Sequence, residues 1–197
     1  QATEEVDALQ AERSALADEV ERLTAGLNDT GVSSIQDQVR RLEVPAGMGA
    51  MRGPGLTVEL DDAPTDALDD PDVDPNFLVV HQQDIQAVVN ALWRGGATAV
   101  TIAGQRVIST TGINCEGNAV QLQGVPYPQP YVIEAVGDDG MLLASIDNDS
   151  LVAGYRDDAA NPEIGIGWSL GAVPPSRSIL PPGRSRLNKR GNRSSAP

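Results

Sequence analysis

Three aspartates at alternate positions, Asp70, Asp72 and Asp74, have the spacing that opens a calcium-binding loop. An EF-hand loop begins D-x-D-x-D, but it also needs glycine at its sixth position and glutamate at its twelfth. Here those positions hold Pro75 and His81, so the motif is incomplete. We therefore expect a solvated acidic loop and no resident metal; a weak divalent-cation site is the alternative.

The single histidine, His81, and the single cysteine, Cys115, restrict the remaining chemistry. A zinc site needs three or four suitable ligands, and these two residues stand far apart in the sequence. A Ser-His-Asp triad would have to use His81, yet no G-x-S-x-G motif is present. Cys115 lies in "NCEGN", next to an acid and in an expected turn, which does not activate a thiol. We predict no catalytic residue and no cofactor; His81, just before a helix, is expected to cap that helix or to lie on the surface.

The stretch "NALWRGGATAVTIAGQRV" raises the question of a phosphate-binding loop, because Gly95 and Gly96 join a helical pattern to an alternating one. A phosphate cradle has the order strand, glycines, helix N-terminus, where backbone N–H groups face the anion. Here the glycines follow the helix instead. The pair is expected to end the helix, with positive φ at one of the two residues.

The composition bounds the class of protein. The chain has 197 residues, 40% of them apolar but only 3% aromatic, which predicts one domain with an aliphatic core. Its net charge is −14, although six basic residues and no acid follow position 176. The remainder carries 8 basic and 28 acidic residues, a net −20, so we expect no nucleic-acid partner. The basic tail, 174–197, is expected to be disordered.

The N-terminal residues, 1–44, have the pattern of a long helix. Six apolar residues occupy heptad positions a and d, namely Val6, Leu9, Leu16, Val20, Leu23 and Leu27. Arg13 interrupts the a positions, and Gly26 and "NDTG" interrupt the helix before a second stripe of Ile35, Val39 and Leu42. We predict a coiled coil that forms a dimer or binds a partner helix; a helix packed on its own domain is the alternative. The chain starts at Gln1 within this pattern, and we expect that a preceding segment was removed.

The middle of the chain, 45–173, alternates between strand and helix patterns. Strands are expected at 55–60, 98–104, 106–110, 119–123, 131–137 and 163–170, with a short extended piece at 77–80. Helices are expected at 82–94, 138–146 and 150–158, the last capped by Ser150. Residues 106–123 are expected to form a hairpin that turns at "NCEGN", and 124–131 a proline-rich loop or edge crossing. In the first helix, Ile85, Val88, Val89 and Leu92 share one face.

These patterns predict an α+β domain: a mixed, largely antiparallel sheet of about five or six strands with helices on one face, after an N-terminal coiled-coil helix. The expected division is a stalk over 1–44, the domain over 45–173 and the tail over 174–197.

The order of several phrases resembles one known family. "GPGLTVEL" precedes "DIQAVVNALWRGGATAVTIAGQRV", and "TGINCEGNAVQLQG" and "PYVIEAVGD" follow. Over about 47–171 this set is similar to the YlxW/YlxX-like family of Gram-positive bacteria, domain of unknown function 881. The acidic insert 61–76 and the chain after Pro174 depart from that pattern.

The resemblance implies a function in outline only. Members typically have an N-terminal membrane helix, a coiled coil and then this domain outside the cytoplasm, and their genes often lie near cell-division and envelope genes. It implies a non-enzymatic, membrane-anchored interaction module. A small-ligand-binding module, with a pocket between the sheet and 124–131, is the alternative, and an enzyme with a carboxylate-based site is a third. The family has no established catalytic residues to carry over.

Overall fold

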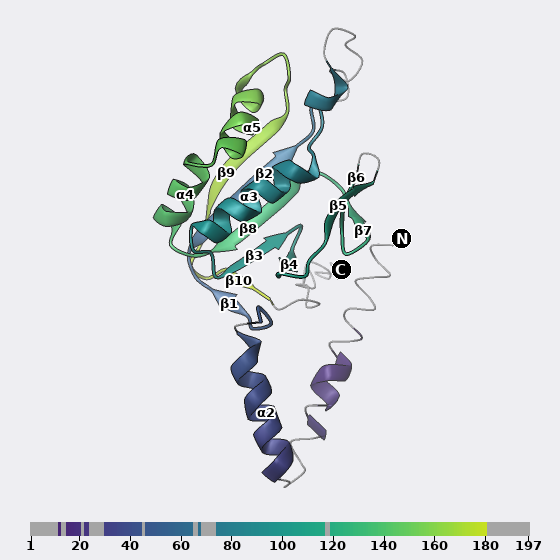
Figure 1. Cartoon of the computed structure of the whole chain (residues 1–197), viewed down its shortest axis with the longest axis vertical. Helices are drawn as coiled ribbons and strands as arrows, with labels where there is room; N and C mark the ends of the chain where they lie inside the picture. Colours follow the sequence, from purple (N-terminus) through teal and green to yellow (C-terminus); the bar gives the residue numbers. More distant parts are fainter. Residues whose placement is uncertain are drawn as a thin grey trace, which may run out of the picture.

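The computed structural model describes residues 12, 15–20, 22–23, 30–44, 46–64, 67, 74–116 and 119–180. Figure 1 shows an α/β body with the helix α2 projecting from one end. The helices are α2 (Thr30–Glu43), the short 3-10 helix η2 (Pro75–Phe77), α3 (Gln82–Arg94), α4 (Asp139–Asp147) and α5 (Ser150–Ala160). The strands are β1 (Met51–Arg52), β2 (Gly55–Asp61), β3 (Ala99–Ile102), β4 (Gln105–Val107), β5 (Ile113–Glu116), β6 (Ala119–Leu122), β7 (Val125–Tyr127), β8 (Tyr131–Val136), β9 (Gly167–Val173) and β10 (Ser178–Ile179).

A five-stranded sheet forms the body, with the strand order β4-β3-β8-β2-β9. Each neighbouring pair in it is antiparallel. The helices α3, α4 and α5 contact one another and cover one face of this sheet (Figure 1). The expected fold class, an α+β domain with helices on one face of a largely antiparallel sheet, is confirmed.

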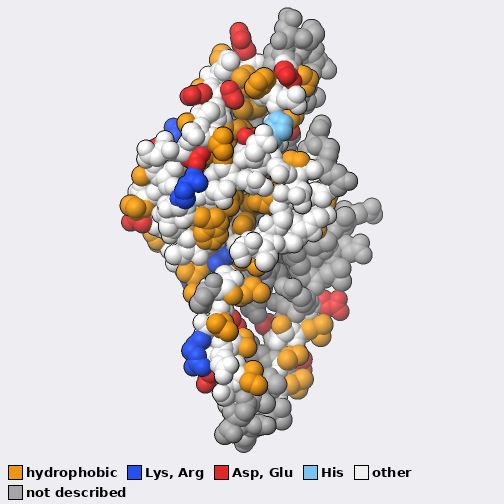
Figure 2. Space-filling model, viewed as in Figure 1, with side chains coloured by type: hydrophobic (Ala, Val, Ile, Leu, Met, Phe, Trp, Pro, Cys, Tyr) orange, Lys and Arg blue, Asp and Glu red, His pale blue; other side chains and the backbone are white. Residues whose placement is uncertain are grey.

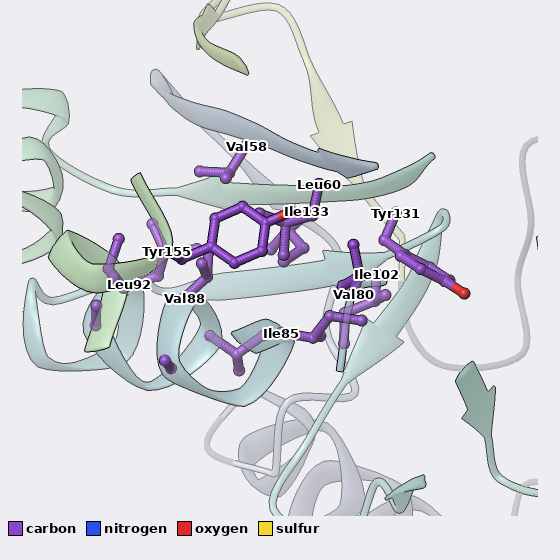
Figure 3. Close-up of a cluster of buried hydrophobic side chains, with 14 of the residues drawn as sticks. Val58, Leu60, Val80, Ile85, Val88, Leu92, Ile102, Tyr131, Ile133 and Tyr155 are labelled. Atoms are coloured by element: carbon purple, nitrogen blue, oxygen red, sulfur yellow. The ribbon is translucent and has the colours of Figure 1, made fainter. Parts of the chain in front are cut away.

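The core lies between this sheet and the helices. Strand periodicity places alternate side chains on the helix-covered face, and on β2 these are Leu56, Val58 and Leu60, all buried. Figure 3 shows side chains of the sheet and of α3 meeting in one cluster. The cluster is almost wholly aliphatic, as the low aromatic content predicts, and its buried aromatic members are Tyr127, Tyr131 and Tyr155. Figure 3 shows Tyr155 in the middle of the labelled side chains and Tyr131 at one side.

Helix α3 matches its expected bounds, 82–94, and buries its expected apolar face. His81 is the N-cap residue, so its expected capping position is confirmed. At the other end Gly95 is the C-cap and Gly96 has φ +85°. The left-handed conformation at Gly96 ends the helix and redirects the chain into β3, which confirms that the glycine pair is a helix terminus.

Two smaller sheets flank the main one. One has the order β5-β6-β7, and the other pairs β1 with β10. The hydroxyl of Tyr131, on β8, accepts a hydrogen bond from the Val120 N–H at 3.3 Å. This bond ties the three-stranded sheet to the end of β8.

The expected hairpin over 106–123 is wrong. Strand β4 pairs with the preceding strand β3 through a turn at Ala103 and Gly104, both with positive φ. The hairpin that does form joins β5 to β6, so Cys115 lies in a strand and not in a turn. Periodicity located the strands but did not determine which strands would pair.

Several local expectations also need correction. Residues 77–80 form no strand: Phe77 ends η2, and Leu78 and Val80 are buried without strand pairing. Helix α5 is capped by Asp149 instead of Ser150, because the Asp149 carboxylate accepts from the N–H groups of Leu151 and Val152. The expectation of disorder after Pro174 is wrong for β10, where Ile179 is buried against Ala99 and Val136.

The stalk is described in part. Residues 15–20 and 22–23 are helical, and α2 carries the second apolar stripe up to Glu43. Leu16, Val20 and Leu23 are about 60% exposed, so these side chains do not pack on the α/β domain. Val6, Leu9, Leu27 and Arg13 lie outside the described residues, and so do Asp70 and Asp72 of the acidic loop. The coiled coil stays a prediction.

Candidate functional site

A cavity of about 600 Å³ opens where the stalk joins the domain. Its walls come from three segments that are distant in sequence: the connector after α2, one side of α3, and the chain from β4 to β5. Thr98, in the loop between α3 and β3, adds to them. The described lining residues are Val44, Ala46, Gly47, Gln86, Val89, Asn90, Trp93, Thr98, Arg106, Val107, Ile108, Ser109, Thr111 and Ile113. Figure 2 shows hydrophobic side chains gathered on the face below α3 and above α2.

Helix α3 supplies one wall through a second stripe of residues. Gln86, Val89, Asn90 and Trp93 follow the same i, i+3, i+4, i+7 spacing as the core-facing set. Val89 belongs to both stripes and is buried, whereas Asn90 and Trp93 remain exposed. The helix therefore faces the core on one side and the cavity on the next.

The connector that forms the second wall is folded back onto the end of α2. The N–H groups of Met48 and Gly49 both donate to the Glu43 carbonyl, at 2.7 and 3.2 Å. Gly47 has φ +72°, and a Cβ placed there would lie 2.8 Å from Cγ2 of Ile108. Glycine at this position lets the connector lie directly against the third wall.

Arg106 on β4 links the connector to the sheet. Its Nη1 donates to the Gly49 carbonyl at 3.1 Å, and its Nη2 lies 3.5 Å from the Thr98 carbonyl, a long and weak contact. Its Nε is buried and has no hydrogen-bond partner among the described residues. The side chain thus holds the connector to the sheet while part of its donor capacity stays unused.

The charge of Arg106 is unusual in its setting. The residue is 6% exposed, and no ion pair among the described residues includes it. Burial lowers the pKa of the guanidinium below its ordinary value, yet arginine remains a cation in proteins. None of the described lining residues is acidic. The cavity of this acidic chain is therefore a locally positive site.

Carboxylates gather instead near the N-terminus of α3. Burial is the largest effect on Asp62 and on Asp84, and it raises the pKa of both above 3.8. Each is already occupied by the backbone: Asp62 Oδ1 accepts from the Val80 N–H at 2.7 Å, and Asp84 Oδ2 from the His81 N–H at 2.8 Å. Within the described part of the chain, no group of three or more His, Cys, Asp or Glu side chains is placed to hold a metal. Asp84 therefore belongs to the cap of α3, and Asp62 holds the backbone of the segment before it.

The cavity is not where the sequence placed a pocket. The pocket is expected between the sheet and 124–131, but β7 of that segment packs inward there, and its Tyr127 is buried against the core. The heptad residues Leu16, Val20 and Leu23 do not line the cavity either. Cys115 is exposed, and its N–H donates to Gln82 Oε1 at 3.1 Å.

Arg106 and the second stripe of α3 are the site residues that the sequence did not reveal. A signal was present in part: Trp93 stands outside the core-facing stripe, and "AGQRV" places an arginine directly before Val107 in an alternating segment. What periodicity lacked was the turn at Gly104, which brings Arg106 opposite Thr101 on β3.

Comparison with known proteins places the domain in a family. The model of a family described as "Bacterial protein of unknown function (DUF881)" matches residues 38–174, which include every wall of the cavity. The chain belongs to this family. The resemblance to YlxW-like proteins is thereby confirmed.

Two curated relatives are similar over part of their length. The chain is 32% identical to UPF0749 protein YlxW of Bacillus subtilis (strain 168) over 113 residues, which are 57% of this chain and 48% of the relative. It is 32% identical to UPF0749 protein Rv1823 of Mycobacterium tuberculosis (strain ATCC 25618 / H37Rv) over 136 residues, 63% of this chain and 41% of the relative. The matched region thus spans less than half of each relative.

One solved structure shares the fold. The crystal structure of an uncharacterized conserved protein from Mycobacterium tuberculosis superposes with a TM-score of 0.55 at 19% identity. The match covers 80% of this chain and 99% of that one. At this identity the likeness concerns the fold alone.

Proposed function

We propose that this DUF881 domain is a non-enzymatic interaction module that associates, through its helical stalk, with a second copy or with a partner helix. The observation that carries the proposal is the exposure of apolar side chains along helical segments. Leu16, Val20 and Leu23 lie at a and d positions and are about 60% exposed. Burying such a side chain is worth about 1.5–3 kcal/mol, so pairing would supply a substantial driving force.

The second stripe has the same character but a different register. Ile35, Val39 and Leu42 on α2 are between 53% and 65% exposed. Ser34, and not Ile35, continues the a positions of the first stripe in steps of seven. The two stripes therefore suit two separate contacts more than one continuous seam.

The cavity supports this reading over a carboxylate-based enzyme. Its described walls contain no Asp or Glu, and Asp62 and Asp84 near α3 are engaged by backbone N–H groups. Family resemblance further supports a membrane-anchored protein with this domain outside the cytoplasm, serving cell division or envelope assembly. Among the described helices none is both long and apolar enough to cross a bilayer.

Sedimentation equilibrium tests the association. The chain is expected to show a concentration-dependent shift towards dimer, weakened by Arg13 at an a position. Leu16→Asp with Leu23→Asp should abolish the shift and leave the domain folded by circular dichroism. The control variant, Ala15→Asp with Arg22→Asp, adds aspartates at c positions of the same helix. It should leave the concentration-dependent shift unchanged. A monomer up to about 1 mM, or an unchanged mass in the Leu variant, would contradict self-association.

The location is tested separately on the full-length protein in intact cells. Cys115 is exposed and is the one cysteine of this sequence, so a membrane-impermeant maleimide should label it from outside. Cys115→Ser should remove that labelling. Labelling of Cys115 only after lysis would place the domain on the cytoplasmic side and overturn this part of the proposal.

A further inference from the structure

We propose that the cavity between α3, β4 and the connector is a binding site for a small amphiphilic oxyanion, that is, an apolar body carrying a carboxylate or a phosphate. This inference goes beyond the association of the stalk, and it rests on the donors of Arg106 and the composition of the walls.

The guanidinium of Arg106 presents one edge that is nearly free. Nε and Nη2 point along the same side of the planar group, which is the geometry that grips two oxygens of one anion. Within the part of the chain that the structure describes, Nε has no partner and Nη2 has only the 3.5 Å contact to the Thr98 carbonyl. Nη1, on the other side, is committed to Gly49. The side chain is thus fixed by one nitrogen. The other edge, whose Nε is buried in this structure, is the one that we assign to a ligand reaching it from the cavity.

Burial without an acid gives this edge a need for an anion. A buried charge is normally paired, but Arg106 is 6% exposed and enters none of the ion pairs of the described residues. The described walls carry no competing carboxylate. An oxyanion whose two oxygens accept from Nε and Nη2 would give Nε a hydrogen-bond partner. The same anion would also neutralise the charge of the guanidinium.

The walls define the rest of the ligand. The sides of the cavity are apolar where they are formed by Val89, Trp93, Val107, Ile108 and Ile113. Neutral polar groups are added by Gln86, Asn90 and Ser109. A volume of about 600 Å³ is in the range of small-molecule sites and too small for a folded partner. These walls favour an apolar body over a sugar or a free inorganic ion.

Trp93 provides the readout, because it lines the cavity. The other tryptophan, Trp168 on β9, packs against Tyr155 of α5 instead. In a Trp168→Phe background, decanoate and decyl phosphate are titrated below their micellar concentrations and Trp93 fluorescence is followed. Decanol tests the apolar body without the anion, and acetate tests the anion without the body. At least one of the two amphiphilic anions should give saturable binding at least roughly tenfold tighter than decanol or acetate.

Two pairs of variants separate the charge from the fold. Arg106→Gln should weaken anion binding at least roughly tenfold, and Arg40→Gln, at an exposed arginine of α2, should leave it unchanged. If Arg106→Gln fails to fold by circular dichroism, Ser109→Asp decides, since this exposed position only adds a negative charge to the rim. Ser109→Asp should weaken the binding of the anions and spare that of decanol. Asn114→Asp adds the same charge at an exposed position of β5 that does not line the cavity, and it should change neither.

The outcomes divide cleanly. Preference for decanoate or for decyl phosphate identifies which oxyanion the edge selects, and either supports the proposal. No saturable binding, equal binding of decanol, or full binding by folded Arg106→Gln or Ser109→Asp would overturn it.

Discussion

The backbone N–H of His81 donates to Oδ2 of Asp84 at 2.8 Å, and Nδ1 of the same histidine lies 3.7 Å from that oxygen. Burial raises the pKa of Asp84 above 3.8, against the opposing effects of this hydrogen bond and of the His81 charge. A raised pKa means that the folded state favours the protonated acid. The stability that Asp84 contributes is therefore complete below pH 3.8 and declines as the pH rises through the raised value.

The first prediction concerns this carboxyl group. Asp84→Asn keeps an acceptor for the His81 N–H but cannot ionise, so urea unfolding should show wild type losing stability relative to the variant as the pH rises above 3.8. Asp84→Ala removes the acceptor and should cost about 1 kcal/mol. Asp139→Asn, at an exposed first-turn aspartate of α4, is the control. A wild type that gains on Asp84→Asn over this pH range contradicts the stated direction.

The second prediction separates the two glycines that follow α3. Gly96 has φ +85° and open space around a notional Cβ, so Gly96→Ala should cost about 1 kcal/mol through backbone strain, and Gly96→Asn less. Gly95 instead lies against α4, where a Cβ would stand 3.0 Å from Cα of Leu142; there Asn should be no better than Ala. Gly154→Ala, inside α5 and unobstructed, should stabilise by up to about 1 kcal/mol. Thermal unfolding measures the stability of these variants. Equal losses of stability at Gly95 and Gly96 for every substitution would show that the two roles are wrongly assigned.

The glycines at the end of α3 could be predicted from the sequence, whereas the site around Arg106 could not. The bounds of α3, its buried face and its glycine terminus follow from interactions within a few residues, so periodicity and capping preferences were sufficient. Strand β8 was equally clear, because its alternation reflects one covered face of the sheet.

Strand pairing and the cavity depend on contacts between distant segments. Alternation in 106–110 and 119–123 fits a hairpin as well as it fits two separate sheets, and only the positive φ at Ala103 and Gly104 sends β4 back along β3. The cavity requires Gly47, Trp93 and Arg106 to converge from three elements. No spacing rule within one element predicts such a convergence.

The third prediction concerns Tyr155 of α5. Its hydroxyl donates to the Gly167 carbonyl at 3.0 Å and joins the helix to β9. Burial, and then the charges of Asp84 and Asp62, raise the pKa of this phenol well above its ordinary value of 10.0. The group therefore contributes stability below pH 10 that is lost as the pH rises further.

Tyr155→Phe should cost about 1 kcal/mol at neutral pH, since it leaves the Gly167 carbonyl without this donor. The difference from wild type should shrink above pH 10, as measured by urea unfolding across that range. Absorbance at 295 nm should show the corresponding phenolate appearing late in the folded protein. An early phenolate that vanishes in Tyr155→Phe contradicts the assigned direction of the pKa.

The last prediction concerns the direction in which two stalks pair. In a parallel, in-register coiled coil, identical d positions face each other across the seam, within the range that a disulfide spans. In a Cys115→Ser background, Leu23→Cys should therefore form a covalent dimer on mild oxidation, and Arg22→Cys, at the neighbouring c position, should not. Non-reducing electrophoresis at low protein concentration measures both. If the two cysteines crosslink equally, the contact is collisional. If neither crosslinks while sedimentation shows a dimer, the stalks pair antiparallel or the dimer forms elsewhere. In that case the a/d residues of the first stripe do not form a parallel seam.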